Sequence, residues 1–223
     1  MRLIAASLLA VFLLPSAFAQ QNAHPVTGRP YAGTMGMVGA PWLVRSERED
    51  EERPDQALDE LKIAKGSTVA DIGAGVGYMS WRLAERVGPT GKVYANDIQA
   101  PMLEQLRRNV AQRHLTNVET VLGEPDDPKL PQGRMDLVLM VDVYHEFSEP
   151  QKMLRHIRES LKPDGRMVLL EYRAEDPNVP IMPLHKMTVN QVKAEIEPEG
   201  FRLDKVLETL PRQHILIFRR KPD

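Results

Sequence analysis

The sequence predicts an α/β fold with a mainly parallel sheet across residues 67–219. Short β-rich runs alternate there with amphipathic segments, which is the pattern of strands joined by helices. The link between the last two strands (210–213) is too short to hold a crossover helix, so these two strands are expected to pair antiparallel. The predicted strands are residues 68–72, 92–97, 117–122, 135–141, 166–172, 201–209 and 214–219.

The helices follow from the spacing of apolar residues. Such residues recur three and four positions apart in residues 76–87, 103–110 and 153–161, which gives each helix one stripe to lay on a sheet. Pro54 opens a shorter helix, because proline is favoured at the first helical position. A proline-rich loop, residues 173–187, precedes a further helix over 188–198. Residues 54–223 are therefore expected to form one domain.

Residues 1–19 have the pattern of a secretory signal peptide. Arg2 precedes an apolar run from Leu3 to Leu14, and Ala17-Phe18-Ala19 forms an A-x-A-like cleavage site. The run is shorter than the ~20 residues that a bilayer span needs. We therefore expect cleavage near Ala19, no stable membrane anchor afterwards, and a periplasmic or secreted protein.

Residues 20–53 are expected to form an N-terminal arm that ends in a charged helix. The arm is rich in Gly, Pro and Ala and shows no periodicity, which is typical of an extended segment. Eight of the nine residues in 45–53 are charged, and such a run most often forms a solvated helix face. The alternative is that Arg45 or Arg48 reaches the functional site.

The composition excludes several classes of site. The 223 residues carry a formal net charge of -2 and include no cysteine. The absence of cysteine excludes disulfides, thiolate nucleophiles and cysteine-ligated metal centres. No excess of Lys and Arg is present to neutralise phosphates, so nucleic acid is not an expected partner. A small-molecule substrate is expected instead, and no oligomeric state is predicted.

A glycine-rich turn in the segment Val69–Ser80 (VADIGAGVGYMS) follows the first strand. Glycines allow a close approach of backbone and ligand. The spacing is G-x-G-x-G, whereas a dinucleotide fingerprint needs Gly or Ala at position 78, where Tyr78 stands. Asp71, two residues before the first glycine, could accept a hydrogen bond from a ligand ammonium group.

Asp97 ends the second strand and is followed by the apolar residues Ile98 and Met102. A carboxylate at this position suits a ribose diol, and the apolar neighbours suit a purine. The alternative is that Asp97 caps the helix that begins near Gln99. Combined with the glycine turn, the pattern favours a ligand site.

These motifs together resemble class I S-adenosylmethionine-dependent methyltransferases, particularly the small-molecule, ubiquinone/menaquinone C-methyltransferase-like (methyltransferase type 11-like) branch. The resemblance covers about Pro54 to Arg219 and rests on Asp97 and on three segments, Asp71–Gly77, Asp136–Asp142 and Leu161–Leu169. It implies a doubly wound, Rossmann-like, seven-stranded sheet with an antiparallel last strand. It also implies S-adenosyl-L-methionine as the cofactor.

The resemblance assigns roles along the cofactor. Asp97 would bind the ribose, Ile98 and Met102 would surround the adenine, and Glu124 would meet the adenine edge. Asp142, at the end of the fourth strand, would close the floor of the site. The methionine end would contact the residues of the first turn, namely Asp71, Gly73, Ala74, Gly75 and Gly77.

His145 and Glu146 are the candidate catalytic residues. They follow the fourth strand, and ligands of parallel sheets bind at the carboxyl ends of the strands. An imidazole is available as a base at neutral pH, so either residue could take a proton from the acceptor. The alternative for each is a structural role. Glu171 and His185 are weaker candidates for the same reason.

No metal site is expected. Imidazole and carboxylate ligands suit zinc or iron, but His145, Glu146, Glu171 and His185 come from three segments without a helical metal-binding spacing. The metal-dependent catechol methyltransferase branch would place an Asp-Asn pair after the fifth strand, where Glu171-Tyr172 stands.

The sequence thus predicts an exported methyltransferase that acts on an unidentified small or medium-sized acceptor. Two other functions stay open: a noncatalytic exported binding protein that keeps the fold, and an NAD(P)-dependent oxidoreductase, which Tyr78 disfavours.

Overall fold

The computed structural model describes residues 22–222, so the predicted signal peptide lies outside the described residues. Eight strands form one sheet in the order β3-β2-β1-β4-β5-β8-β7, with β6 paired to β5 beside this path. The strands are β1 (Thr68–Ile72), β2 (Lys92–Asp97), β3 (Val118–Leu122), β4 (Met135–Val141), β5 (Leu161–Arg173), β6 (Lys186–Met187), β7 (Phe201–Leu207) and β8 (Gln213–Arg220).

The pairing confirms the predicted doubly wound sheet. β1 pairs in parallel with β2 and β4, and the register places Val69 opposite both Val93 and Leu137. β8 runs antiparallel to both β5 and β7, as the short preceding link requires. Two features were not predicted. β5 begins five residues earlier than expected, at Leu161, and the two-residue strand β6 lies within the proline-rich loop.

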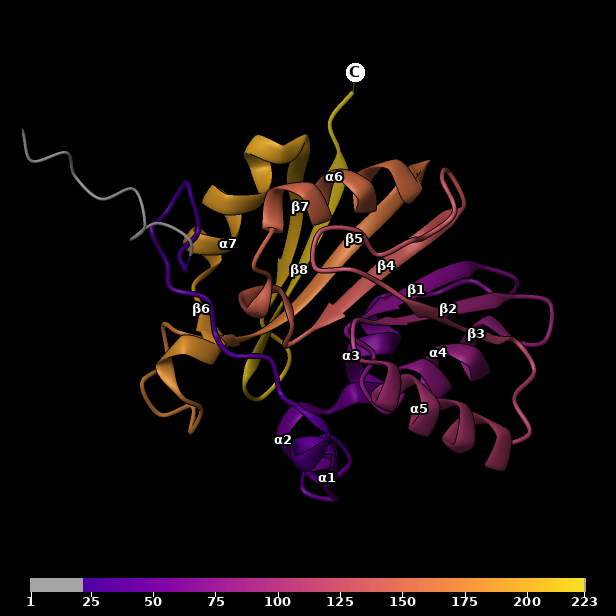
Figure 1. The fold of residues 1–223 in the computed structure, drawn as a ribbon. Coiled ribbons are helices and arrows are strands. Elements are labelled where there is room, and N and C mark those ends of the chain that lie inside the picture. The colour runs from indigo at the N-terminus through magenta and orange to yellow at the C-terminus, as the bar shows by residue number, and fades with distance from the viewer. Residues whose placement is uncertain (1–21, 223) are drawn as a thin grey trace, which may run out of the picture.

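Helices cover both faces of the sheet (Figure 1). The longer helices are α3 (Pro54–Glu60), α4 (Ser80–Val87), α5 (Ala100–Gln112), α6 (Pro150–Ser160) and α7 (Val189–Ile196). Successive side chains along a strand point to opposite faces of the sheet. Val69 and Leu137 pack with α3 and α4, whereas Ala70 and Val138 pack with α6 and α7. None of the described helices has the length and apolar character needed to cross a membrane.

Short elements complete the chain. Before α3 the arm forms η1 (Met37–Gly39), α1 (Ala40–Leu43) and α2 (Arg48–Glu52), and later single turns are η2 (Tyr144–Glu146), η3 (Pro183–His185) and η4 (Glu197–Glu199). In Figure 1 the indigo arm runs past α7 and β6 to α1 and α2, at the end of the sheet where β1 and β4 finish. The arm thus covers the end of the sheet at which ligands bind.

The charged run is not simply a solvated face, which corrects the first expectation for residues 45–53. Arg48 and Glu52 lie one turn apart on α2 and are 6% and 3% exposed. Arg48 Nε donates to Glu52 Oε2 at 2.6 Å. Each of the two side chains offsets the cost of burying the charge of the other. The alternative, in which Arg45 and Arg48 reach the functional site, is the one that the structure supports.

Candidate functional site

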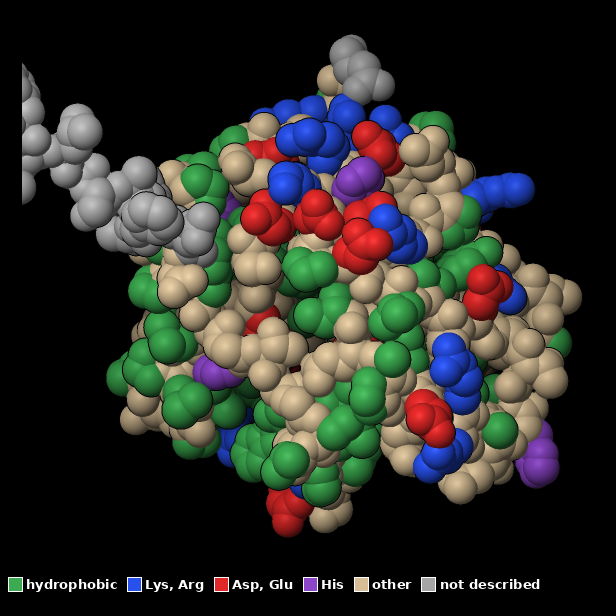
Figure 2. Space-filling view, in the orientation of Figure 1, with side chains coloured by type: hydrophobic (Ala, Val, Ile, Leu, Met, Phe, Trp, Pro, Cys, Tyr) green, Lys and Arg blue, Asp and Glu red, His purple; other side chains and the backbone are tan. Residues whose placement is uncertain are grey.

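A cavity of about 850 Å³ opens where β1, β2, β4 and β5 end. Its volume is within the range of pockets that bind small molecules and cofactors. Four parts of the chain line it: the glycine turn and the end of β2, the segment after β4, the loop before β6, and the N-terminal arm. Figure 2 shows hydrophobic side chains over α1 and over the loop before β6, and charged side chains over α6.

The first wall joins the glycine turn to Asp97. Asp97 Oδ2 accepts from the Gly75 N–H at 2.9 Å, and Oδ1 accepts from the Gln99 N–H at 2.8 Å. Asp97 therefore fixes the backbone of the turn that leads into α5, although no side chain caps that helix, and Asp97 also lines the cavity. Each carboxylate oxygen retains a lone pair for a ligand hydroxyl. Burial raises the pKa of Asp97, and the backbone N–H groups oppose that rise.

Two glycines give this wall its shape. Gly73 and Gly75 line the cavity and have φ of +68° and +53°, which L-residues rarely adopt. A Cβ on Gly75 would lie 2.8 Å from Leu43 Cδ1 of the arm. Ile98 and Met102 also line the cavity, as expected for an adenine pocket.

Asp142 closes the floor in a strained conformation. Its φ is +52°, and its Oδ2 accepts from Gln213 Nε2 at 2.7 Å. Its Oδ1 is buried and has no hydrogen-bond partner among residues 22–222. Burial raises the pKa of Asp142 well above its usual value, and the nearby Glu52 and Glu171 raise it further. An orphaned buried acceptor beside a cavity indicates a ligand donor, such as an ammonium group.

Four predicted cofactor residues do not line the cavity. Ala74 and Gly77 belong to the turn behind it, where a Cβ on Gly77 would lie 2.7 Å from Leu106 Cγ. Asp71 is buried beneath the turn and accepts from Ser80 Oγ at 2.6 Å. Burial raises its pKa to about 7. Glu124 is exposed after β3 and pairs with Lys129. Asp71, Ala74 and Gly77 support the turn, and Glu124 lies away from the cavity.

The opposite wall contains a histidine held by a carboxylate. His145 Nδ1 lies 2.6 Å from Glu171 Oε2, and both residues are buried. His145 Nε2 lies 3.1 Å from His185 Nδ1. Burial acts to lower the pKa of His145, but Glu171 prevails and raises it. Glu146 lines the same wall, and burial raises its pKa to about 7. The structure thus brings together the four candidate residues that follow β4 in the sequence, namely His145, Glu146, Glu171 and His185.

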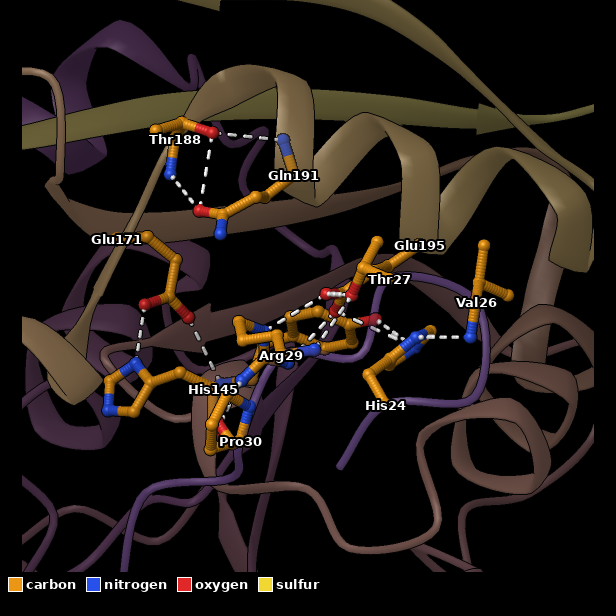
Figure 3. A network of polar contacts seen from close by, with 11 residues as sticks. His24, Val26, Thr27, Arg29, Pro30, His145, Glu171, Thr188, Gln191 and Glu195 are labelled. Atoms are coloured by element: carbon orange, nitrogen blue, oxygen red, sulfur yellow. Dashed lines mark hydrogen bonds and ion pairs between the residues drawn. The ribbon is translucent and has the colours of Figure 1, made fainter. Parts of the chain in front are cut away.

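The arm is tied to this histidine by a network that the sequence does not reveal (Figure 3). Arg29 binds Glu195 of α7 twice, Nε to Oε1 at 3.0 Å and Nη2 to Oε2 at 2.9 Å. Arg29 Nη1 also donates to the His145 carbonyl oxygen at 3.0 Å. The Ala32 N–H donates to the same carbonyl at 3.1 Å. One buried arginine therefore fixes both the arm and the backbone of His145.

A second contact fixes the arm over the glycine turn. Tyr78, the residue that interrupts the dinucleotide spacing, donates its hydroxyl hydrogen to Glu49 Oε1 at 2.8 Å. The Arg48 guanidinium lies 4.2 Å from the centre of the Tyr78 ring. Glu52 in turn accepts from the Tyr172 hydroxyl at 2.8 Å. The charged run was the only sequence signal for this contact.

Comparisons with known proteins agree with this geometry. Residues 63–210, about two thirds of the chain, match the family described as methyltransferase domain. The chain belongs to this family. A relative, the nocamycin O-methyltransferase of Saccharothrix syringae, is 32% identical over 143 residues, covering 64% of this chain and 51% of its own. The ubiquinone/menaquinone biosynthesis C-methyltransferase of Hahella chejuensis is 31% identical over 127 residues, covering 56% and 50%.

The matched segments therefore span about half the length of these curated methyltransferases. A solved structure, a SAM dependent methyltransferase from Aquifex aeolicus, superposes with a TM-score of 0.78 at 27% identity. That match covers 83% of this chain and 98% of the other. These likenesses confirm the predicted Rossmann-like fold, and the family implies S-adenosyl-L-methionine as the cofactor.

The residues present fit that cofactor. Gly73 and Gly75 allow the turn to pack closely against Val143 and Leu43 at the cavity wall, and Asp97 offers two acceptor oxygens to a diol. The orphaned Oδ1 of Asp142 suits an ammonium donor. Three carboxylates near the floor, Glu52, Asp142 and Glu171, also favour a ligand that carries positive charge.

Proposed function

We propose that this methyltransferase-family protein transfers a methyl group from S-adenosyl-L-methionine to a small or medium-sized acceptor. One observation carries the proposal. A single cavity holds the glycine turn locked to Asp97 on one wall and the His145–Glu171 pair on the other. When bound, the cofactor supplies an electrophilic methyl group on its sulfonium.

The cofactor wall binds and orients. Asp97 would accept hydrogen bonds from the ribose hydroxyls, and its own bond to the Gly75 N–H holds it in place for them. Ile98 and Met102 would pack on the adenine, and the Asp142 Oδ1 would accept from the ammonium group. Fixing both reactants in a near-attack arrangement supplies much of the acceleration in a one-step transfer.

The acceptor wall contains the group that would take a proton from the acceptor. The Glu171 carboxylate accepts a hydrogen bond from His145 Nδ1, which leaves a lone pair on His145 Nε2 at the cavity wall, where His185 Nδ1 lies 3.1 Å away. This nitrogen would take the proton from an acceptor that must lose one, and Glu171 would stabilise the imidazolium. We propose His145 as this base and place Glu146 beside the acceptor.

The character of the acceptor follows from the rest of this wall. Trp42 and Leu43 from the arm, Phe147 after β4, and Ile181 and Met182 from the loop before β6 all line the cavity. We infer an acceptor with an apolar body and one polar atom to be methylated, because the apolar walls would hold the body and His145 would face the polar atom.

Calorimetric titration of the purified protein with S-adenosyl-L-methionine and, separately, with NAD tests the proposal. We expect one site for the first ligand and none for NAD. Binding of NAD alone would instead indicate an oxidoreductase. Tight binding of S-adenosyl-L-methionine with no methyl transfer to any of a panel of small phenols, amines and thiols would favour a noncatalytic binding protein.

We also propose that the protein acts in the periplasm or outside the cell. The support is the Arg2, apolar-run and Ala17–Ala19 pattern, which lies outside the described residues. N-terminal sequencing of the protein recovered from its native host checks this. A mature chain that begins near Gln20 supports export, and a retained apolar run in the cytoplasmic fraction contradicts it.

A further inference from the structure

Three side chains with ligand-type atoms converge on the acceptor wall. His145, Glu146 and His185 each offer one such atom, and these atoms lie within 4.8 Å of one another. All three residues line the cavity. The first two belong to η2 after β4, and the third belongs to η3 in the loop before β6. The cluster is therefore a product of the fold and has no counterpart in sequence spacing.

The imidazoles of His145 and His185 lie with one ring nitrogen of each directed at the other. His145 Nε2 and His185 Nδ1 are 3.1 Å apart, and the rings meet at 79° with centroids 5.0 Å apart. With Zn–N bonds of about 2.0–2.1 Å, two nitrogens on one ion lie roughly 2.8–3.4 Å apart for ligand angles of about 90–110°. The observed separation falls in this range.

The tautomer of His145 suits ligation. Its Nδ1 lies 2.6 Å from Glu171 Oε2, so the ring donates from Nδ1 and leaves Nε2 unprotonated. A carboxylate behind a histidine is the usual partner that fixes the orientation and the basicity of a metal-binding imidazole. Glu171 is fully buried, and its other oxygen accepts from the Tyr144 N–H at 3.1 Å. Glu171 is therefore a rigid support for this role.

We propose that a divalent transition-metal ion binds to His145 Nε2, His185 Nδ1 and the Glu146 carboxylate. Two imidazoles and one carboxylate suit zinc, ferrous iron or manganese, whereas magnesium and calcium prefer oxygen ligands alone. Three protein ligands leave coordination positions open. Because all three residues line the cavity, these positions face the space assigned to the acceptor.

The ion would change how the acceptor is activated. It occupies the lone pair of His145 that otherwise takes a proton, so it polarises the acceptor atom in place of the imidazole. This consequence rests on the proposed methyl transfer, whereas ion binding itself does not. The acceptors that fit are those with an oxygen, nitrogen or sulfur atom that can coordinate the ion.

Titration of the chelator-treated protein with Zn²⁺ by calorimetry tests the site, and visible absorption after Co²⁺ addition reports coordination. We expect one ion per chain and about 10- to 100-fold weaker binding in Glu171→Gln, because that variant loses only the supporting contact. We expect His185→Ala to lose the site. His156→Ala is the matched control, because this exposed histidine on α6 pairs with Glu159 and lies outside the cavity.

The proposal is overturned if the unmodified protein takes up no Zn²⁺, or if His185→Ala binds Zn²⁺ as tightly as His156→Ala does. Circular dichroism of each variant distinguishes loss of the site from loss of the fold. S-adenosyl-L-methionine affinity is measured on the same variants. Unchanged cofactor binding with no ion binding would reject the ion alone, and absent cofactor binding would reject the proposed function instead.

Discussion

The two walls of the cavity are built in different ways. Apart from Asp142 on the floor, the cofactor wall comes from one stretch of the chain, residues 73–102, which contains the glycine turn, the end of β2 and the start of α5. The acceptor wall combines three distant segments: the arm, the residues after β4, and the loop before β6. A local wall keeps its geometry through backbone hydrogen bonds, whereas a composite wall depends on long-range side-chain contacts.

This difference separates the two functions experimentally. Substitutions on the cofactor wall should change cofactor affinity, and substitutions on the acceptor wall should change the rate of the chemical step or the docking of the arm. The separation is clearest for groups whose contacts lie within one wall, such as Asp97 and His145.

The largest effect is expected for Gly75→Val. A branched side chain at φ +53° would strain the turn, and its Cβ, 2.8 Å from Leu43, would push the arm and the turn apart at the cavity wall, so cofactor binding should be abolished. Gly133→Val is the matched control, because Gly133 has φ +64° and nothing within 4 Å of a built Cβ. Calorimetry with both variants separates backbone strain from lost binding. Normal cofactor binding in Gly75→Val would mean that the turn has a structural role and does not contact the cofactor.

His145→Gln should slow the chemical step by about 10² to 10⁴ with little change in cofactor affinity. In chelator-treated protein, the unsubstituted enzyme should become faster as pH rises through the raised pKa of His145 and then level off, because only the neutral ring accepts a proton. Single-turnover rates measured across this pH range test for the rise and the plateau. A variant that keeps the full rate and the same pH profile would assign His145 a structural role.

Arg29→Ala should destabilise the protein by about 3–5 kcal/mol, because it leaves the buried Glu195 carboxylate without its arginine. It should also slow the reaction, since the His145 backbone loses its contact to the arm. Arg202→Ala, which breaks an exposed pair with Asp204, should cost less than about 1 kcal/mol. Urea unfolding measures both. Equal midpoints for the two variants would show that the arm is not fixed by this pair.

Asp97→Asn should weaken cofactor binding by about 1–3 kcal/mol, or about 5- to 150-fold, because it removes a charged acceptor. One backbone N–H, from Gly75 or Gln99, also loses its partner, so a smaller loss of stability is expected. Asp126→Asn, on the loop after β3 and outside the cavity, is the control. Identical cofactor affinity in both variants would remove Asp97 from the site.

The last effect, a change in the pH dependence of stability with no change in the reaction itself, concerns Asp71, the buried residue beneath the turn. Its pKa is about 7 in the folded protein against 3.8 for the free group, so its contribution to stability is full below about pH 4 and is lost as pH rises to about 7. Asp71→Asn cannot titrate, so its unfolding free energy should fall less steeply over this window. Denaturant curves at several pH values test this. Parallel pH dependences would exclude Asp71 as the titrating group.

Six of the ten cofactor residues predicted from sequence line the cavity. Gly73, Gly75, Asp97, Ile98 and Met102 all line the cavity, because strand–turn–helix geometry is set by nearest neighbours along the chain. The predictions that missed the cavity have local reasons. Gly77 makes room for Leu106, which pattern matching cannot distinguish from contact with a ligand. Glu124 lies on a loop whose path depends on its own turn and on Lys129.

The acceptor wall was predicted only in part. His145 and Glu146 were found because they follow a predicted strand, whereas Arg29 and Glu195, 166 positions apart, carry no joint signal. The role of Arg48 was left open, because the elements that pack against a charged helix decide which of its residues become buried. Its burial became clear only once Tyr78 and Glu52 were placed beside it.

The sequence by itself determined the order of strands and helices, the antiparallel end of the sheet and the cofactor turn, because periodicity and link lengths act over a few residues. The tertiary structure alone decided that the arm closes the cavity, that Asp142 keeps an unpartnered oxygen, and that His145 and His185 meet at 3.1 Å. These features depend on which distant surfaces become neighbours when the sheet is covered. Packing settles that choice, because many weak apolar contacts outweigh the local preferences of any single segment.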